Sequence, residues 1–256
     1  MAVEDFPAGG VLVVGGSGGI GSVIARRFAE AGCDVALTYR RNWTKANETV
    51  EAIRALGVCA EAFAADVTQP AEVEKMVADA IGAMGRLHTI VFVVGQMPAQ
   101  KYLAQIDDAE WQQAIDVELH GFYHVARATL PHLREKGGSY VHLGSAGDLA
   151  WVNRDGLSIV PKAANEALVR GIAREEGRFG IRANSVLIGV IEAGMFLKFT
   201  AAGVFDDNYV KKTYERLALK RLGRPEEVAD PVVFLASNRA AYVTGQQIAA
   251  AGGYGI

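Results

Sequence analysis

A run of glycines near the start of the chain has the composition and the position of a phosphate-binding loop. It reads Gly15-Gly-Ser-Gly-Gly19-Ile-Gly21, after a short apolar run and before an amphipathic helical pattern. Glycines let the backbone turn tightly and approach a pyrophosphate, whose charge is stabilised at a helix N-terminus. A glycine motif alone is weakly specific, but this one has a strand before it and a helix after it. We therefore expect a nucleotide site that includes Gly15, Ser17, Gly19, Ile20 and Gly21.

The next polar cluster predicts which dinucleotide binds. The second apolar run ends in Tyr39-Arg40-Arg41, where an acidic residue would accept a hydrogen bond from the ribose 2′-hydroxyl of NAD. A guanidinium fork instead suits a 2′-phosphate, which a carboxylate would repel. The alternative is a solvated basic turn with no ligand. We expect NADP(H), with Tyr39, Arg40 and Arg41 around the 2′-phosphate.

The rest of the sequence supplies the elements that must position these residues. Short β-branched runs alternate with helical patterns, which requires parallel pairing and right-handed crossovers. The strands are nearly continuous apolar runs, as in a sheet that is buried on both faces. We expect one α/β domain over residues 1–256, a doubly wound Rossmann fold whose mostly seven-stranded parallel sheet has helices on both faces. The expected strands are 11–14, 34–39, 59–64, 88–94, 139–143, 181–188 and 247–250, and the later helices include 108–136, 161–179 and 225–236.

Composition excludes several classes of function. The 256 residues carry a net charge of −3, and the 26 basic residues are scattered, unlike the dense basic face of a nucleic-acid binder. The acidic start lacks the basic region of a signal peptide, and no apolar run is long enough to span a membrane. We expect a cytoplasmic protein with a small-molecule substrate and with no nucleic-acid, membrane or metal partner.

The glycine spacing also gives the chain a resemblance to a known family. Gly-x-x-x-Gly-x-Gly differs from the Gly-x-Gly-x-x-Gly of other dinucleotide folds and resembles that of the short-chain dehydrogenases/reductases, over essentially the whole chain. The resemblance implies that Ser145, thirteen residues before Ser158, orients the substrate and that Lys162 holds the nicotinamide ribose. It extends the expected cofactor site to Asp66, Val67, Gly95, Lys162, Gly189 and Ile191.

The nicotinamide half of the site departs from that family. The family's Tyr-x-x-x-Lys element reads Ser158-Ile-Val-Pro-Lys162. A tyrosine hydroxyl can exchange a proton as hydride moves, whereas a serine hydroxyl is far less acidic and is shorter by a ring. We favour Ser158 as a helix cap, with Pro161 in the first turn, over a direct catalytic role. The other departures are Phe92-Val-Val-Gly95 for Asn-Asn-Ala-Gly, Ile188 for proline and Ala193 for threonine.

Two further sets of residues bear on proton transfer. The resemblance puts Asp116 at the family's fourth-helix asparagine, where its carboxylate would pair with Lys162; a solvated or capping aspartate is the alternative. Ser145, Ser158, Lys162 and Asp116 are thus the candidate catalytic residues. Substitute acids also fall near the strand ends, and the sequence does not choose among them: they are Tyr102, His120, His142, Asp148 and Asp155.

Residues 192–219 form a candidate substrate lid, because they follow a strand end and ligands of open α/β sheets bind beyond the carboxyl ends of the strands. A packing pair of helices is an equal alternative. Met195, Phe196, Phe199 and Trp151 suggest an apolar pocket, although core packing explains them equally well.

The sequence therefore favours an NADP(H)-dependent oxidoreductase of the short-chain dehydrogenase/reductase type, acting on a small carbonyl or alcohol substrate through an atypical active site. One alternative is a catalytically impaired nucleotide-binding homologue, and another is a non-redox lyase, isomerase or dehalogenase on the same scaffold. The resemblance also implies a homo-oligomer, a dimer or a homotetramer, assembled through helices 108–136 and 161–179 and the C-terminal end.

Overall fold

Seven strands form the sheet at the centre of the fold, and every neighbouring pair is parallel. The computed structural model describes residues 5–96 and 98–256. The spatial order is β3-β2-β1-β4-β5-β6-β7, which confirms the predicted doubly wound fold. The strands are β1 (Gly10–Val14), β2 (Asp34–Tyr39), β3 (Ala60–Ala64), β4 (Leu87–Phe92), β5 (Gly138–Ser145), β6 (Ile181–Ile188) and β7 (Gln247–Ala250).

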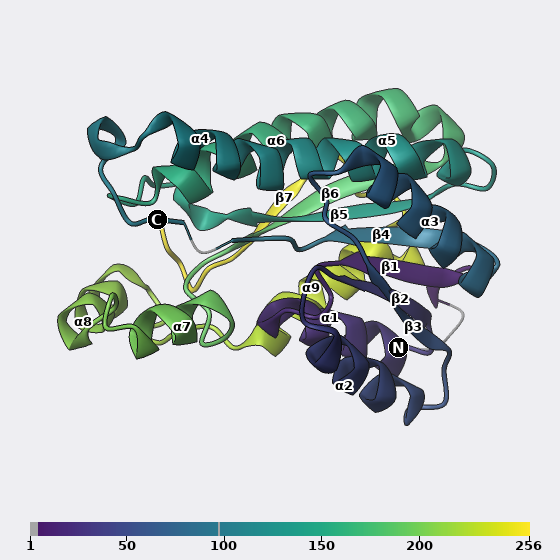
Figure 1. Ribbon diagram of the computed structural model, residues 1–256, viewed down its shortest axis with the longest axis horizontal. Helices are drawn as coiled ribbons and strands as arrows, with labels where there is room; N and C mark the ends of the chain where they lie inside the picture. Colours follow the sequence, from purple (N-terminus) through teal and green to yellow (C-terminus); the bar gives the residue numbers. More distant parts are fainter. Residues whose placement is uncertain (1–4, 97) are drawn as a thin grey trace.

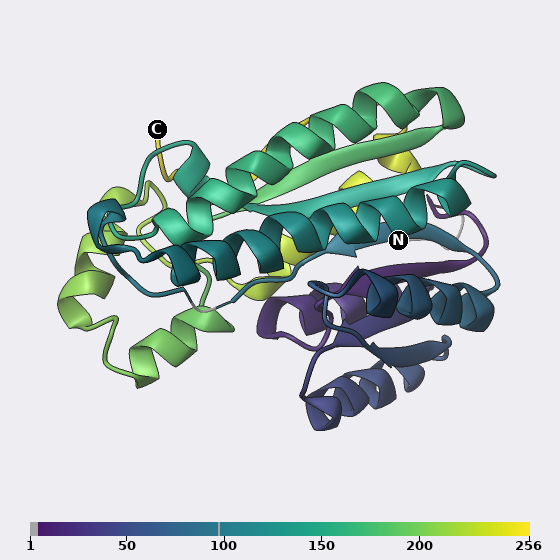
Figure 2. The ribbon, with the colours of Figure 1, turned by 45° about the horizontal axis from the view of Figure 1, so that its top comes forward.

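Helices cover both faces of this sheet, as Figures 1 and 2 show. One layer contains α1 (Gly19–Glu30), α2 (Trp43–Arg54) and α9 (Pro225–Ala236). The other contains α3 (Pro70–Met84), α4 (Asp108–Ala114), α5 (Gly121–Leu133) and α6 (Gly156–Glu176). Fully buried Ile24 and Phe28 pack under the first layer, and Phe122 and Tyr140 under the second. The five inner strands are thus buried on both sides, as their composition predicted, whereas the edge strands β3 and β7 are partly exposed.

The helix predicted over 108–136 is interrupted. A π-helical stretch, η3 (Ile115–His120), separates α4 from α5, and the N–H of Gly121 donates to the carbonyl of Asp116, five residues earlier. The carbonyl of Glu118 accepts a hydrogen bond from Asn165 Nδ2 at 2.9 Å. Such π-bulges are frequent at functional sites, and this one changes which side chains of the helix face α6.

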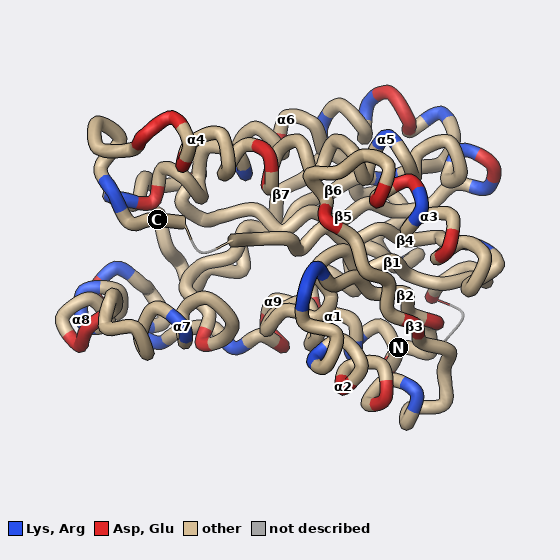
Figure 3. Tube along the Cα trace, viewed as in Figure 1, with Lys and Arg blue, Asp and Glu red and all other residues tan. Residues whose placement is uncertain are grey.

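The candidate lid is folded as two short helices beyond the end of β6. They are α7 (Met195–Ala201) and α8 (Asp207–Arg216), and Figure 1 shows them extending away from the sheet at the end where β6 finishes. No helix in the described ranges combines the length and apolarity needed to cross a membrane. Basic and acidic residues alternate along the elements in Figure 3 instead of gathering by sign.

Candidate functional site

The glycine loop lies between β1 and α1, where the order of the strands reverses and ligands of doubly wound sheets bind. Gly15 has a φ of +90°, which a side chain would strain, and a Cβ on Gly21 would collide with the Gly15 carbonyl oxygen. The N–H of Gly15 donates to Thr38 Oγ1 at 2.9 Å, and the N–H of Ser17 donates to the Thr38 carbonyl at 3.3 Å. These bonds hold the loop against the end of β2.

The first turn of α1 presents backbone amides suited to an anion. Gly18 caps this helix without a side-chain hydrogen bond, and no acidic residue lies in the first turn. The first amides of a helix lack intrahelical acceptors and carry partial positive charge. This donor set fits the pyrophosphate of a dinucleotide. A Cβ on Gly19, however, would lie 2.7 Å from the backbone of Gly194, so the chain's own lid segment already uses the close approach that this glycine permits.

The basic residues after β2 are exposed, beside the turn that follows β3. Arg40 Nη1 lies 3.9 Å from Asp66 Oδ2, and about half of the Arg40 side chain is exposed. The other oxygen of Asp66 accepts from Thr68 N and Oγ1. Arg41 is exposed, whereas Val67 is buried. Both guanidinium groups are therefore accessible to an anion. The Asp66 carboxylate is held by its hydrogen bonds to Thr68 in the turn after β3.

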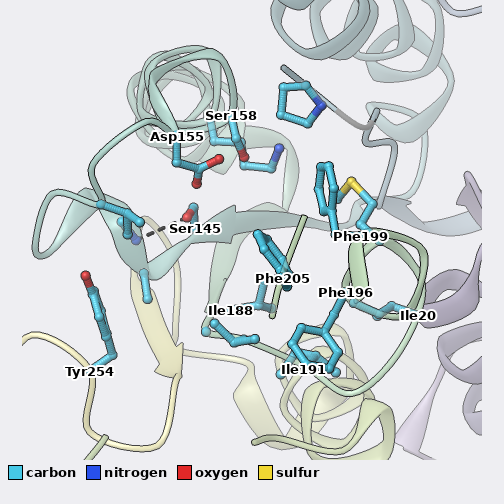
Figure 4. Close-up of a pocket in the computed structure, with 18 of the residues that line it drawn as sticks. Ile20, Ser145, Asp155, Ser158, Ile188, Ile191, Phe196, Phe199, Phe205 and Tyr254 are labelled. Carbon is cyan, nitrogen blue, oxygen red and sulfur yellow. Dashed lines mark hydrogen bonds between the residues drawn. The ribbon is translucent and has the colours of Figure 1, made fainter. Parts of the chain in front are cut away.

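A pocket opens at the carboxyl ends of β5 and β6 and brings Ile20 of the glycine loop together with residues predicted around the nicotinamide, while the other residues predicted around the pyrophosphate and the 2′-phosphate lie outside it. Figure 4 shows Asp155 and Ser158 on one wall and Phe199 and Phe205 on another. The pocket is lined by Ile20 from the glycine loop and by several residues that the sequence singled out: Ser145, Asp155, Ser158, Lys162, Ile188, Gly189, Ile191, Ala193, Met195, Phe196 and Phe199. Gly95 lies outside this lining, where a Cβ would be 3.4 Å from Met195 Cε.

The carboxylate that pairs with Lys162 is Glu118, so the expected Asp116–Lys162 pair is wrong. Lys162 Nζ donates to Glu118 Oε1 at 2.7 Å, and both side chains are buried. Asp116 faces outward, where its Oδ1 binds Gln112 Nε2 and His120 Nδ1. The two carboxylates are two residues apart in η3 and point to different sides. The second oxygen of Glu118 is buried and has no hydrogen-bond partner in the described part of the chain.

Ser158 lies inside helix α6, so its predicted role as a cap is also wrong. The helix begins at Gly156, which makes Ser158 its third residue and puts Pro161 in the second turn. The N–H of Ser158 donates to the Asp155 carbonyl at 3.0 Å. Asp155 occupies the cap position, although its side chain makes no capping hydrogen bond. Ser145 ends β5, and its Oγ accepts from Gly147 N at 3.1 Å.

Of the five substitute acids, Asp155 lines the pocket and the other four do not. Tyr102, Asp148 and His120 are exposed. His142 belongs to β5 and its side chain is buried, with Nδ1 2.9 Å from Oε1 of Glu166 on α6. Its other ring nitrogen is 3.4 Å from Asn165 Nδ2. His142 is therefore a hydrogen-bonded core residue, and the geometry selects Asp155 from the set.

Burial dominates the environment of Asp155 and raises the pKa of its carboxyl to about 6. A hydrogen bond from Gln100 Nε2, at 3.4 Å to Oδ1, acts in the opposite direction, as does the positive charge of Lys162. The negative charge of Glu118 adds to the rise. The sequence alone gave no sign of this, because it depends on residues from three separate segments meeting at one place.

Aromatic side chains of the candidate lid, residues 192–219, form the opposite wall of the pocket. Phe205 stacks on Tyr209 with ring centroids 3.9 Å apart and packs against Phe199 at 4.8 Å and Phe196 at 5.9 Å. All four rings line the pocket. Burial is the main cause of the raised pKa of Tyr209, and the nearby Asp155 contributes to it. Trp151 was expected here but is exposed and lies outside the lining.

The chain is similar in sequence and in fold to known reductases and dehydrogenases. The family profile for enoyl-(acyl carrier protein) reductase matches residues 14–255. The chain is 32% identical over 247 residues to the 3-oxoacyl-[acyl-carrier-protein] reductase FabG of Staphylococcus epidermidis, covering 94% of this chain and 97% of the relative. It is 34% identical over 245 residues to the L-rhamnose 1-dehydrogenase (NAD(P)(+)) of a Sphingomonas species, covering 95% and 94%. A solved short-chain type dehydrogenase/reductase from Mycobacterium ulcerans superposes with a TM-score of 0.90 at 28% identity, covering 97% of this chain and 90% of that one.

Proposed function

Because the chain belongs to the short-chain dehydrogenase/reductase family, we propose that it is an NADP(H)-dependent oxidoreductase that acts on a small carbonyl or alcohol substrate. One observation carries this proposal: a single pocket is lined both by Ile20 of the glycine loop and by Ser145 and Lys162. A cofactor held at the loop would therefore lie beside the polar groups that can act on a substrate. The curated relatives described above are named as a reductase and a dehydrogenase, which supports the same class of reaction.

The residues of the site fit a phosphorylated dinucleotide. The first turn of α1 would hold the pyrophosphate, Arg40 and Arg41 the 2′-phosphate, and Lys162 the nicotinamide ribose. Asp66, Val67, Gly95, Gly189 and Ile191 complete the proposed cofactor site. When bound, a nicotinamide supplies or accepts hydride. The Sphingomonas relative is named for NAD(P)(+), and the exposed arginine pair favours the phosphorylated form for this chain.

The polar groups of the pocket have different proposed roles in substrate binding and proton transfer. Ser145 lies at the end of β5 with its hydroxyl beside the pocket and would orient a substrate oxygen. Lys162 is neutralised by Glu118 at 2.7 Å and would act by hydrogen bonding more than by net charge. Ser158 lines the same wall but carries no ring that could extend its hydroxyl to the substrate. The proton that accompanies hydride must therefore come from another group.

Cofactor binding tests the first half of the proposal. Titration of the protein with NADPH and NADH, followed by fluorescence, is expected to show tighter binding of NADPH. Arg41→Ala should weaken NADPH binding by about tenfold, the scale of one charge-assisted contact, and leave NADH binding unchanged. Arg54→Ala, an exposed arginine on α2 that pairs with Glu51, is the matched control. Equal binding of the two cofactors would contradict the NADP(H) assignment.

A second candidate is a redox-inactive nucleotide-binding homologue. It is favoured by one observation, the absence of an aromatic hydroxyl at Ser158 beside a lysine that is already paired. NADPH oxidation over a panel of aldehydes and ketones distinguishes the candidates, because an inactive homologue binds the cofactor and turns over none of them. A gain of reductase activity in Ser158→Tyr would show that the rest of the site is competent. No gain would favour a site in which other catalytic features are lost as well.

We also propose a cytoplasmic homo-oligomer in which residues 192–219 act as a lid. The lid is supported by the aromatic residues that α7, α8 and their connection contribute to the pocket. The oligomer is supported by a groove between α5 and α6, whose partly or fully exposed lining includes Tyr123, Leu130, Ala167 and Leu168.

A further inference from the structure

Reduction of a carbonyl consumes a proton as well as hydride, and the usual donor position holds Ser158. The pocket contains one titratable carboxyl group on the same wall. Asp155 precedes α6 and lies three residues before Ser158, which is about one helical turn. Figure 4 shows its carboxylate pointing into the pocket beside Ser158 and toward Ser145. Within the described ranges, the one side-chain hydrogen bond to Asp155 comes from Gln100 at 3.4 Å, so its oxygens are available to a ligand.

We propose that Asp155 is the residue that exchanges this proton with the substrate oxygen, an inference that rests on the proposed function. In the reductive direction, the carbonyl carbon gains hydride from the reduced nicotinamide. The electron pair of the C=O π bond takes the proton of the Asp155 carboxylic acid, which gives an alcohol and the Asp155 carboxylate. In the oxidative direction the carboxylate takes the hydroxyl proton as hydride leaves. Solvent restores the proton of Asp155 after each reduction.

The electrostatics of the pocket suit this role, because a carboxyl with an ordinary pKa would be ionised at neutral pH and could not act as an acid. The charged and titratable groups that face Asp155 are Lys162 on α6, Glu118 on η3 and Tyr209 on α8. Glu118 binds the ammonium of Lys162 at 2.7 Å and so offsets its pull on Asp155. Burial prevails, and the pKa of Asp155 lies at about 6. Both protonation states are then accessible near neutral pH, as general acid–base catalysis requires.

Glu118 is accordingly a positioning residue in this scheme. It hydrogen-bonds to Lys162 but does not itself line the pocket, and it acts on Asp155 through charge. Removal of its negative charge should lower the pKa of Asp155, both directly and by freeing the charge of Lys162. The pKa of Asp155 is therefore a readout of this role, because it would not change if Glu118 were purely structural.

The first experiment is the pH dependence of kcat/KM for NADPH-dependent reduction of an aryl ketone, which matches the aromatic wall of the lid. For the wild type we expect a plateau below about pH 6 and a fall of up to tenfold per pH unit above it, because the acid form is required. Asp155→Asn is isosteric and should lower kcat by about 10²–10⁴-fold and abolish this pH dependence. Asp148→Asn, an exposed aspartate on the same β5–α6 connection, should leave both unchanged. Asp155→Asn with the wild-type rate and profile would overturn the proposal.

The second experiment needs no turnover. The carboxyl of Asp155 is titrated in the cofactor-free protein by infrared difference spectroscopy between the wild type and Asp155→Asn. We expect a midpoint near pH 6 that moves to lower pH in Glu118→Gln, together with a parallel shift of the kinetic profile. A midpoint near 4, or one that Glu118→Gln does not move, would overturn the proposal.

The two experiments separate this inference from the proposed function. If the wild type binds no NADPH or reduces no member of the panel, the proposed function fails, whatever the titration shows. If the wild type reduces the ketone and Asp155→Asn does so equally well, the function stands and the inference fails. The double variant Asp155→Asn/Ser158→Tyr adds a check of the role itself, because a restored rate would show that Asp155 supplied the missing acid.

Discussion

At the scale of single residues, burial of the ionised Asp155 carboxylate is expected to lower the free energy of unfolding of the protein. Its pKa is about 6 in the folded chain, against an ordinary value of 3.8. The folded state therefore holds the proton more tightly than the unfolded state. Below about pH 4 the group is neutral in both states and costs nothing. As the pH rises through 4 to 6 the unfolded state ionises first, so the folded state loses relative stability and reaches its full loss above pH 6.

Asp155→Asn should therefore stabilise the protein by about 1–2 kcal/mol above pH 6, after allowance for solvent screening. The gain should shrink toward zero as the pH falls to 4. Denaturant unfolding at a series of pH values measures it, with Asp148→Asn as the control that shows no such trend. A variant that is less stable than the wild type at pH 8 would show that the Asp155 carboxylate makes a stabilising contact.

The residues that were hardest to predict from the sequence are those whose role depends on the exact side of a helix. The resemblance predicts a carboxylate–lysine pair but assigns the carboxylate to Asp116. The π turns of η3 direct Glu118 toward Lys162 and leave Asp116 with His120. Ser158 was likewise interpreted as a cap because Pro161 resembles an N-terminal proline, whereas α6 begins at Gly156. Composition and spacing predict which segments contribute to the site. The exact helical register determines which side chains in those segments contact each other.

At the scale of elements, the proposed lid contacts the first turn of α1 through two glycines, Gly19 and Gly194. A Cβ on Gly19 would lie 2.7 Å from both the Cα and the N of Gly194, which are backbone atoms that cannot give way easily. Gly194 itself has a φ of +55° and precedes α7. The segment that leads into the lid is thus packed directly on the first turn of α1. A substitution at Gly19 should therefore disturb both the first turn of α1 and the segment that precedes α7.

Gly19→Ala is expected to displace the lid and to weaken cofactor binding at the same time. Limited proteolysis should cut within residues 192–219 several-fold faster in this variant, and the affinity for NADPH should fall by about tenfold or more. Gly82→Ala, which lies in α3 with no atom near the added methyl group, is the control and should change neither. Unchanged proteolysis together with weaker binding would show that the contact between Gly19 and Gly194 does not hold the lid.

Most elements were predictable because their signals are local. The sequence predicts all seven strands to within about two residues, mostly from apolar β-branched runs, although β3 has no β-branched residue. Glycines or prolines mark many helix boundaries. The π stretch had no local signal, since it arises where the Glu118 carbonyl meets Asn165 from α6. The position of residues 192–219 after a strand end suggests a lid, which stays a prediction, and the contact of this segment with α1 joins residues far apart in the sequence.

At the scale of the whole molecule, alternation of strands and helices was sufficient to predict the architecture, because parallel pairing and right-handed crossovers leave few topologies. The same rules place the ends of β1, β5 and β6 on one edge of the sheet, and with them the glycine loop, Ser145 and the lid. The chemistry of that edge was predictable only in outline. Its net charge and its available acid depend on pairs, such as Glu118 with Lys162, that long-range packing creates.

The proposed oligomer makes a prediction about the outer face of α5 and α6. The groove between these helices is lined mainly by apolar side chains, and the ring of Tyr123 on its edge is half exposed. Burying such a surface against a second copy would remove apolar area from water. Light scattering should then give a mass that is a multiple of 27.3 kDa. Tyr123→Arg should lower that mass, because an unpaired guanidinium at a closed interface must be desolvated.

The same substitution at Tyr242→Arg provides the control. Tyr242 is fully exposed, follows η6 (Asn238–Ala240) and is not among the residues that line the groove, so its replacement should leave the mass unchanged. Circular dichroism of both variants separates dissociation from unfolding. A monomeric wild type would contradict the oligomer, and dissociation by Tyr242→Arg but not by Tyr123→Arg would move the interface to another face. Because pocket residues on α6 continue directly into this face, loss of the oligomer should also raise KM for the substrate more than it lowers kcat.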